Sequence, residues 1–204
     1  VEYAREETIT GRLKTTSGPE ILHLAKVHRE TILESRFGSQ GRIIELDYKS
    51  IEPRVLLAYK GFREIPDDVY AHVRDELFLT SGLSRDVVKD TALSLIYGAG
   101  LDSVAEKTQL PSRTVEGMAN ALDPFFGLTA LKSRLVEEND ANDRKFITNH
   151  YGRRVSTATA RNGILVNYWT QSTAMDVVLY GFSSIVQYLR VLEAPIVPLF
   201  VLTD

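Results

Sequence analysis

Two short apolar runs, each ending in an aspartate, are the strongest constraint on how this chain folds. Ile43-Ile44-Glu45-Leu46 precedes Asp47, and Phe200-Val201-Leu202-Thr203 precedes Asp204. Short runs rich in β-branched and aromatic residues are typical of strands. If the two strands lie side by side, their terminal carboxylates come close together, and like charges in such proximity require a cation or a raised pKa. We therefore expect a sheet edge that carries two carboxylates.

The residue types in the chain restrict the cation. There is no cysteine, and the four histidines are too far apart in sequence to form a helical metal pair. This composition excludes disulfides, thiolate zinc sites, iron–sulfur clusters and cysteine nucleophiles. Oxygen ligands without histidine favour a hard cation, and Mg²⁺ is the expected ion.

Start and stop signals predict several helices. They are expected over 54–60 after Pro53, over 85–97 between Ser84 and Gly98, from Pro111-Ser112 onward, after a break at Asp123-Pro124, and over 164–192 with an interruption near Gly181. Residues 146–148 and 154–156 flank Tyr151-Gly152 and predict a hairpin. Residues 196–202 predict a buried strand. This order of helices and strands, without βαβ regularity, predicts an α+β fold.

The helix that follows Ser84 carries a stripe of chemically useful side chains. Arg85, Lys89, Leu93 and Tyr97 recur every four residues. Two cations near a helix N-terminus favour an anion, and the ring at the far end lies ~18 Å along the axis, within the length of a nucleoside triphosphate. The alternative from the pattern alone is a solvated basic stripe with a packed tyrosine.

A second basic segment lies near the predicted hairpin. Residues 144–161 carry five basic side chains and no acidic one, although the whole chain has a net charge of −3. Such a stripe can follow a phosphate backbone; the alternative is an arginine-rich hairpin in solvent. The most apolar stretch, 194–202, contains two prolines and is far shorter than the ~20 residues that a membrane span needs. We expect no membrane partner, and we interpret the chain, which begins at Val1, as an internal piece of a longer protein.

Several motifs, taken together, resemble the polymerase domain of family A DNA polymerases, which include bacterial DNA polymerase I-like and bacteriophage enzymes. The segment from Asp47 to Arg54 is similar to the first palm motif, and Arg85-x3-Lys89-x3-Leu93-x3-Tyr97-Gly98 is similar to the fingers motif. Further similar segments, in the family's order, are Thr10-Gly11-Arg12-Leu13, Gly152-Arg153-Arg154, Asn167-x3-Gln171-x-Thr173-Ala174-x-Asp176 and Thr203-Asp204.

The resemblance implies a palm antiparallel sheet with an inserted helical fingers subdomain, truncated at Asp204. Residues 1–62 would form the thumb-to-palm connection and first palm motif. Residues 63–145 would form the helical fingers, and residues 146–204 would form the palm hairpin, helix and incomplete second metal-aspartate strand. The implied reaction is template-directed addition of a deoxynucleotide to a primer 3′ end. The implied location is the cytoplasm of a bacterial or phage-infected host cell.

Site roles follow from the resemblance residue by residue. Asp47, the Tyr48 carbonyl and Asp204 would hold two Mg²⁺ ions, with Mn²⁺ as a substitute. Lys89 would contact the inner phosphates and donate a proton to the leaving group, and Arg85 would clamp the outer phosphates. Glu52, Tyr48, Leu93 and Tyr97 would complete the dNTP site, with Glu52 excluding a 2′-hydroxyl. The residues expected to contact primer–template DNA are Arg12, Arg153, Arg154, Asn167, Gln171 and Thr203.

The chain departs from the family pattern at several positions. Leu93 stands where an aromatic residue is usual, Thr203 where a histidine is usual, and Gly163 where an arginine is expected. Two alternatives stay open: a single-subunit RNA polymerase-like enzyme, and a catalytically degenerate module that binds DNA. The isolated piece is expected to be inactive, and the sequence does not identify a processivity factor.

Overall fold

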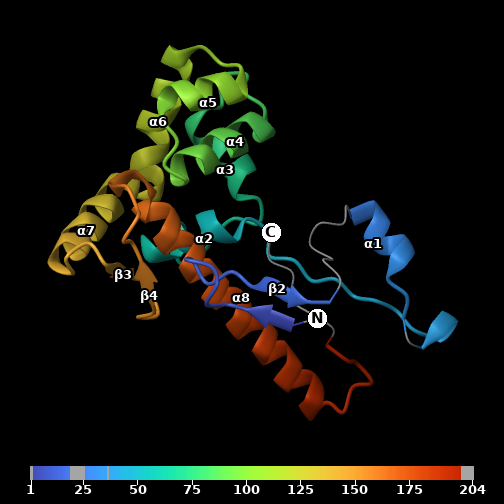
Figure 1. Ribbon diagram of the computed structural model, residues 1–204. Helices are drawn as coiled ribbons and strands as arrows, with labels where there is room; N and C mark the ends of the chain where they lie inside the picture. The colour runs from blue at the N-terminus through green and yellow to red at the C-terminus, as the bar shows by residue number, and fades with distance from the viewer. Residues whose placement is uncertain (1, 19–25, 36, 199–204) are drawn as a thin grey trace. The chain divides into compact units, whose positions relative to one another are not determined.

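The computed structural model describes residues 2–18, 26–35 and 37–198 (Figure 1). The chain divides into two compact units: one combines Val1–Tyr48 with Val177–Asp204, and the other is Lys49–Asp176. The end of the second apolar run, including Thr203 and Asp204, lies outside the described residues, so the predicted pairing of the two aspartate strands is not tested.

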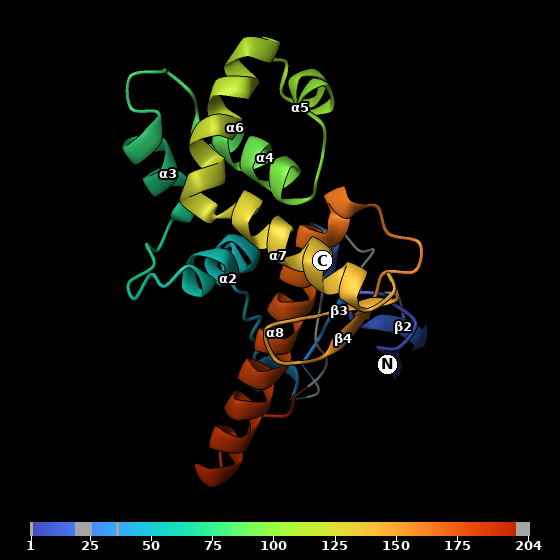
Figure 2. The same ribbon diagram turned by 90° about the vertical axis from the view of Figure 1, so that its left-hand side faces the viewer.

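The unit formed by Lys49–Asp176 is mainly helical. Its elements are α2 (Ile51–Tyr59), α3 (Val69–Leu77), α4 (Arg85–Ile96), α5 (Leu101–Thr108), α6 (Ser112–Phe126), α7 (Leu128–Ala141), β3 (Phe146–Thr148), β4 (Arg154–Ser156), the 3₁₀ turn η3 (Asn162–Ile164) and the first part of α8 (Leu165–Val191). Helix α4 packs against α3, α5 and α6, and α7 packs against α6 and β3 (Figure 2). Apolar side chains with no exposed surface, including Leu56, Val73, Val88, Ile96, Val115 and Leu135, form its core.

Helix α4 begins and ends where the sequence predicts. The Ser84 hydroxyl accepts a hydrogen bond from the Val87 amide at 3.3 Å, which satisfies one free N–H of the first turn. Gly98 takes a positive φ of 79° and ends the helix. The predicted helix near Pro53 is also present, because proline is tolerated in the first turn, where its missing N–H has no helical partner.

The predicted break at Asp123-Pro124 is wrong. Pro124 lies inside α6, and the chain turns only at Gly127, which has a φ of 71°. Only two residues of the helix, Phe125 and Phe126, follow the proline. The Lys60 ammonium stabilises this end by donating to the carbonyl oxygens of Pro124 at 2.5 Å and Phe125 at 3.1 Å. The Asp123 carboxylate accepts from the Thr129 amide at 3.0 Å and so starts α7.

The hairpin that follows α7 matches its prediction. Strands β3 and β4 are antiparallel, with Ile147 opposite Val155. Both of these side chains are buried, whereas the flanking residues Arg154 and Ser156 are exposed. The alternation follows from the period of two along a strand.

The other unit contains a two-stranded antiparallel sheet of β1 (Glu2–Ala4) and β2 (Lys14–Ser17), helix α1 (Lys26–Ile32) and the 3₁₀ turn η2 (Gly38–Gln40). The predicted strand over 43–46 is wrong: these residues have no regular structure, and Ile44 and Leu46 are 68% and 70% exposed. A strand requires a neighbour for its backbone N–H and C=O groups, and within residues 2–18, 26–35 and 37–198 none pairs with this segment.

Helix α8 runs from Leu165 to Val191 without the predicted interruption at Gly181. The glycine has a packing role there, because a Cβ at Gly181 would overlap the Tyr48 hydroxyl. The elements found in both units amount to an α+β fold with small antiparallel sheets. No helix in the described part of the chain is long and apolar enough to span a membrane.

Candidate functional site

Two residues from separate predicted motifs form a direct hydrogen bond. The Tyr97 hydroxyl, at the end of α4, donates to Glu52 Oε2 in the first turn of α2 at 2.6 Å. Glu52 is 9% exposed and Tyr97 is 37% exposed. The bond thus joins a largely buried carboxylate to a ring that still presents surface to solvent, and it fixes the start of α2 against the end of α4.

The other end of α4 carries a guanidinium held by carboxylates. Arg85 Nε donates to Asp68 Oδ2 at 2.7 Å, and Arg85 Nη1 donates to Asp86 Oδ1 at 3.2 Å. The guanidinium also lies 5.6 Å from the centre of the Tyr70 ring. The Asp68 pair raises the pKa of Arg85, and the Arg85 hydrogen bond lowers the pKa of Asp68. Arg85 is therefore charged and oriented along the first turns of α3 and α4.

Tyr70 is a member of this site that sequence reasoning missed. It is 2% exposed, and burial, followed by the Glu52 charge, raises the pKa of its hydroxyl to about 12. The Ser50 side chain forms a hydrogen bond with it. Tyr70 thus lies between the carboxylate of α2 and the guanidinium of α4. The available signal was Asp68, whose side chain caps α3 by accepting from the Ala71 amide at 3.0 Å.

The last residue of the first predicted motif holds the site's loops together. Arg54 Nε donates to the Lys49 carbonyl at 2.8 Å, and Nη2 donates to the carbonyls of Pro66 and Asp67, both at 2.9 Å. A planar guanidinium with several fixed donors suits such multiple carbonyl contacts. These bonds fix the loop before α3 against the start of α2, and so position Asp68.

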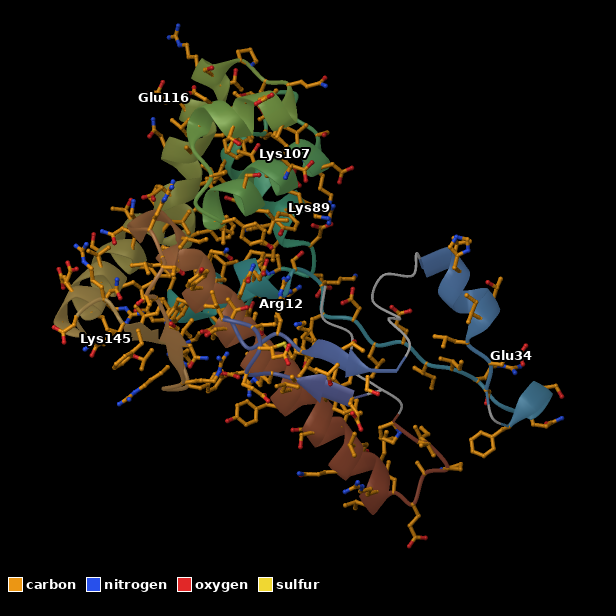
Figure 3. All side chains as sticks on the ribbon, in the orientation of Figure 1. Arg12, Glu34, Lys89, Lys107, Glu116 and Lys145 are labelled. Atoms are coloured by element: carbon orange, nitrogen blue, oxygen red, sulfur yellow. The ribbon has the colours of Figure 1, made fainter. Side chains whose placement is uncertain are left out.

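Lys89 and Leu93 occupy the middle of the stripe on α4. Both are partly exposed. In the described part of the chain, no carboxylate forms an ion pair with Lys89, which extends from the side of α4 (Figure 3). The four predicted stripe residues therefore differ. Arg85 is paired with carboxylates, Lys89 is unpaired among the described residues, Leu93 is a partly exposed apolar side chain, and Tyr97 is bonded to Glu52.

An open hollow of about 350 Å³ adjoins Tyr97. Its other walls include Arg161, Ile164 and Tyr168, from η3 and the segments that flank it. The Gly98 backbone approaches η3 so closely that a Cβ at Gly98 would overlap the Gly163 carbonyl. Glycine at the end of α4 thus allows this side of the hollow to form. The hollow combines aromatic rings with a cation, which are groups that can stack on a planar ring.

The predicted DNA-contact residues lie in different settings. Asn167 and Gln171 are partly exposed and one turn apart on α8; Asn167 Oδ1 is buried and has no hydrogen-bond donor among the described residues. Arg12, in the smaller unit, is partly exposed in the loop between β1 and β2, where its carbonyl accepts from the Thr8 hydroxyl at 2.6 Å.

The two hairpin arginines differ sharply. Arg153 Nε lies 3.3 Å from Asp176 Oδ2, with side-chain exposures of 26% and 6%. Arg154 is exposed, and its guanidinium lies 4.5 Å from the centre of the Phe146 ring. Within the described ranges Arg154 has no carboxylate partner. Sequence reasoning expected the same role for both.

The expected metal ligands are described only in part. Asp47 is exposed and forms no hydrogen bond or ion pair with another described residue, and Tyr48 is 41% exposed. The Asp47 carboxylate is a hard oxygen donor, which fits Mg²⁺. Among the residues that the structure describes, no three histidines or carboxylates lie close enough together to hold a metal ion, and Asp204 is outside this range.

Comparison with known proteins gives a consistent class of relatives. No protein-family model matches the chain. A protein named DNA polymerase from Mycobacterium phage D29 is 28% identical over 143 residues, which cover 65% of this chain and 23% of that protein. DNA polymerase theta of Caenorhabditis elegans is 25% identical over 189 residues, which cover 83% of this chain and 11% of that protein.

A further similar protein, named DNA polymerase, comes from Mycobacterium phage L5. It is 27% identical over 139 residues, covering 65% of this chain and 22% of the relative. The chain thus spans less than a quarter of the length of each of these curated relatives. Their shared name supports a relation between this chain and DNA polymerases.

Proposed function

We propose that this chain belongs to the polymerase domain of a family A DNA polymerase, which adds deoxynucleotides to a primer 3′ end under the direction of a template. Its palm and fingers would supply the dNTP site. The observation that carries this proposal is the Glu52–Tyr97 hydrogen bond of 2.6 Å, because it joins the first palm motif to the fingers motif. The similarity to three proteins named DNA polymerase supports it independently.

The α4 face would bind the nucleotide. Lys89, unpaired among the described residues, would contact the inner phosphates and donate a proton to the departing pyrophosphate. The Arg85 guanidinium would release Asp68 and bind the outer phosphates instead, since a triphosphate offers several oxygens to its donors. Leu93 would supply an apolar wall beside the sugar.

The Glu52–Tyr97 pair would act on the sugar and base. A carboxylate that is 9% exposed and bonded to a tyrosine is fixed in place, and a fixed side chain can exclude a 2′-hydroxyl sterically. Tyr97 would lie beside the nascent base pair, next to the hollow of about 350 Å³. Arg12, Asn167 and Gln171 would contact the DNA minor groove, where acceptors occupy similar places in every base pair.

Asp47, the Tyr48 carbonyl and Asp204 are the residues proposed to hold two Mg²⁺ ions. Bound magnesium would lower the pKa of the primer hydroxyl and neutralise the leaving pyrophosphate. The protein's contribution is positioning and electrostatic stabilisation of the transferred phosphate, which are the main sources of catalysis in phosphoryl transfer.

The first test is primer extension by the intact protein. Asp47→Ala should abolish extension in Mg²⁺ and in Mn²⁺ while primer–template affinity stays within about twofold, because one exposed carboxylate leaves most phosphate contacts unchanged. Asp67→Ala, an exposed aspartate outside the proposed ligand set, is the matched control and should extend normally. Equal extension by Asp47→Ala and the unaltered protein would refute the metal assignment.

A second test separates the proposal from its alternatives. The intact protein should incorporate dNTPs in strong preference to rNTPs, and Glu52→Ala should reduce that preference. Equal use of both nucleotides by the unaltered protein would favour the RNA polymerase-like alternative. Normal DNA binding with no extension in either metal would favour the degenerate DNA-binding module.

A further inference from the structure

The Thr173-Ala174-x-Asp176 end of the α8 motif has no role in the proposed nucleotide site, yet Asp176 is the most buried carboxylate of the described residues at 5% exposure. A buried charge is strongly destabilising unless it is paired and hydrogen-bonded. Two partners of Asp176, Asn149 and Arg153, come from the hairpin turn between β3 and β4. Asn149 Nδ2 donates to Asp176 Oδ2 at 2.5 Å, and Arg153 Nε lies 3.4 and 3.3 Å from the two carboxylate oxygens.

Asn149 organises the turn itself. Its Oδ1 accepts from the backbone amides of Tyr151 at 3.0 Å and Arg153 at 2.9 Å, and its Nδ2 also donates to the Ser172 carbonyl at 3.2 Å. An amide can present acceptor and donor groups to opposite sides at once, whereas a carboxylate only accepts. Asn149, 5% exposed, therefore fixes the turn on one side and binds Asp176 on the other.

Two more bonds seat the same turn on α8. Arg153 Nη2 donates to the Ser172 carbonyl at 3.1 Å, and the His150 amide donates to the Thr173 hydroxyl at 3.2 Å. Ser172, Thr173 and Asp176 lie on one side of a single helix, at positions that face the turn. The turn is thus held to α8 by backbone, amide and charged contacts.

Strand alternation places the neighbouring arginine in solvent. Val155 is buried, so Arg154 lies on the opposite face of β4, where it is exposed. Its guanidinium carbon lies 4.5 Å from the centre of the Phe146 ring, a contact that restrains the side chain while the residue stays exposed.

We propose that Asn149 and Asp176 are positioning residues that withdraw Arg153 from DNA and present Arg154 as the phosphate-contacting cation of the hairpin. The phosphate contact of Arg154 rests on the proposed DNA-binding function, whereas the anchoring of the turn by Asp176 does not. It narrows the expectation from the sequence, in which both arginines contact phosphates, to a division of labour: Arg153 binds the helix and Arg154 binds the backbone of the nucleic acid.

The test measures two quantities on this chain: backbone amide hydrogen exchange at Tyr151 and Arg153, and affinity for a primer–template duplex over a salt series. Arg154→Gln should lower the salt slope by about 0.9, which is about a 3.5-fold smaller loss of affinity between about 50 and about 200 mM salt. Its amide exchange should match the unaltered chain. Arg153→Gln should speed exchange at both amides by at least about tenfold and leave the salt slope unchanged, because Arg153 contacts no phosphate. Asp176→Asn should speed exchange by a similar factor and raise the salt slope by up to about 0.9, because it releases Arg153 toward the DNA.

Arg153→Lys is the conservative variant, and it guards against loss of folding in the other two. Because lysine keeps the charge but not the forked donors, it should restore part of the exchange protection at an unchanged salt slope. A lower salt slope in Arg153→Lys or Arg153→Gln, or unchanged protection in Asp176→Asn, overturns the proposal. If the unaltered chain does not bind the duplex, the DNA-binding function is refuted. The exchange data alone then decide whether Asp176 anchors the turn.

Discussion

Tyr70 is the residue whose ionisation responds most clearly to its surroundings. Burial raises the pKa of its hydroxyl to about 12 from the ordinary value of 10.0. Folding therefore favours the neutral phenol. The stability that the neutral phenol contributes is present in full below pH 10 and is lost as the pH rises toward about 12. This loss lowers the free energy of unfolding by about 2–3 kcal/mol.

Tyr70→Phe should remove that alkaline sensitivity. Urea unfolding at a series of pH values should show a smaller loss of stability in the variant than in the unaltered chain. Tyr188→Phe, at a ring that is 63% exposed, is the control and should follow the unaltered chain. Identical pH profiles for Tyr70→Phe and the unaltered chain would contradict the assignment.

Asp68 has two separable functions, as the cap of α3 and as the partner of Arg85. Asp68→Asn keeps an oxygen for the Ala71 amide and removes the charge, so it should destabilise by less than about 1 kcal/mol. Asp68→Ala also removes the cap and should lower the free energy of unfolding by about 1 kcal/mol more.

Urea unfolding measures both Asp68 variants. Asp86→Asn is the control, because that carboxylate is 85% exposed and contributes little at 3.2 Å from Arg85. If Asp68→Asn and Asp68→Ala were equally destabilised, the cap would have no measurable role.

Some site residues were predictable from the chain and others were not. The four-residue spacing from Arg85 to Tyr97 follows directly from helix geometry. The pairing of Arg153 with Asp176 joins residues 23 positions apart and requires the tertiary structure. Even so, strand alternation from Val155 would have placed Arg153 and Arg154 on different faces. Tyr70 carried no periodic signal, since only packing against α2 and α4 gives it a role.

At the scale of elements, Gly98 determines how α4 meets η3. Gly98 has a φ of 79°, in the left-handed region, and a Cβ added here would overlap the Gly163 carbonyl. Gly98→Ala should therefore lower the free energy of unfolding by at least about 1–2 kcal/mol, from the left-handed conformation alone.

Gly117→Ala is the matched control for Gly98→Ala. Gly117 lies inside α6, and a Cβ there would meet no atom within 4 Å. The alanine should stabilise the chain by about 0.5–1 kcal/mol. Thermal unfolding compares the two variants, and a stable Gly98→Ala would show that η3 moves away without cost.

Elements with local signals were predicted well, and elements that need a distant partner were not. Ser84 and Gly98 mark both ends of α4 within the sequence itself. Residues 43–46 have strand-forming composition, but a strand forms only against another strand, which no local pattern can supply. Pro124 failed as a break signal because the helix ends only two residues later, where the Lys60 ammonium binds the carbonyl oxygens of Pro124 and Phe125.

At the scale of the molecule, the apolar core is concentrated in Lys49–Asp176. Among the described residues, the buried apolar side chains belong to this unit with the exception of Ala4. The segment Lys49–Asp176 should therefore fold without the rest of the chain. Circular dichroism and urea titration of this segment should show helical structure and one cooperative transition; a gradual transition would mean that the core depends on the other unit.

The α+β class was accessible from sequence at this scale, because helix and hairpin signals are local. The division into units was not, since the first unit joins both ends of the chain. The three segments expected from the polymerase resemblance, 1–62, 63–145 and 146–204, stay a prediction.

The turn at Asn149 also has a consequence for chemical ageing. Spontaneous deamidation of an asparagine begins when the next backbone nitrogen attacks the side-chain amide carbon. Here that nitrogen, of His150, is bonded to the Thr173 hydroxyl, and the Asn149 amide is itself fully engaged. Mass spectrometry of a long-stored sample should find Asn149 intact in the folded chain and converted in the urea-unfolded one.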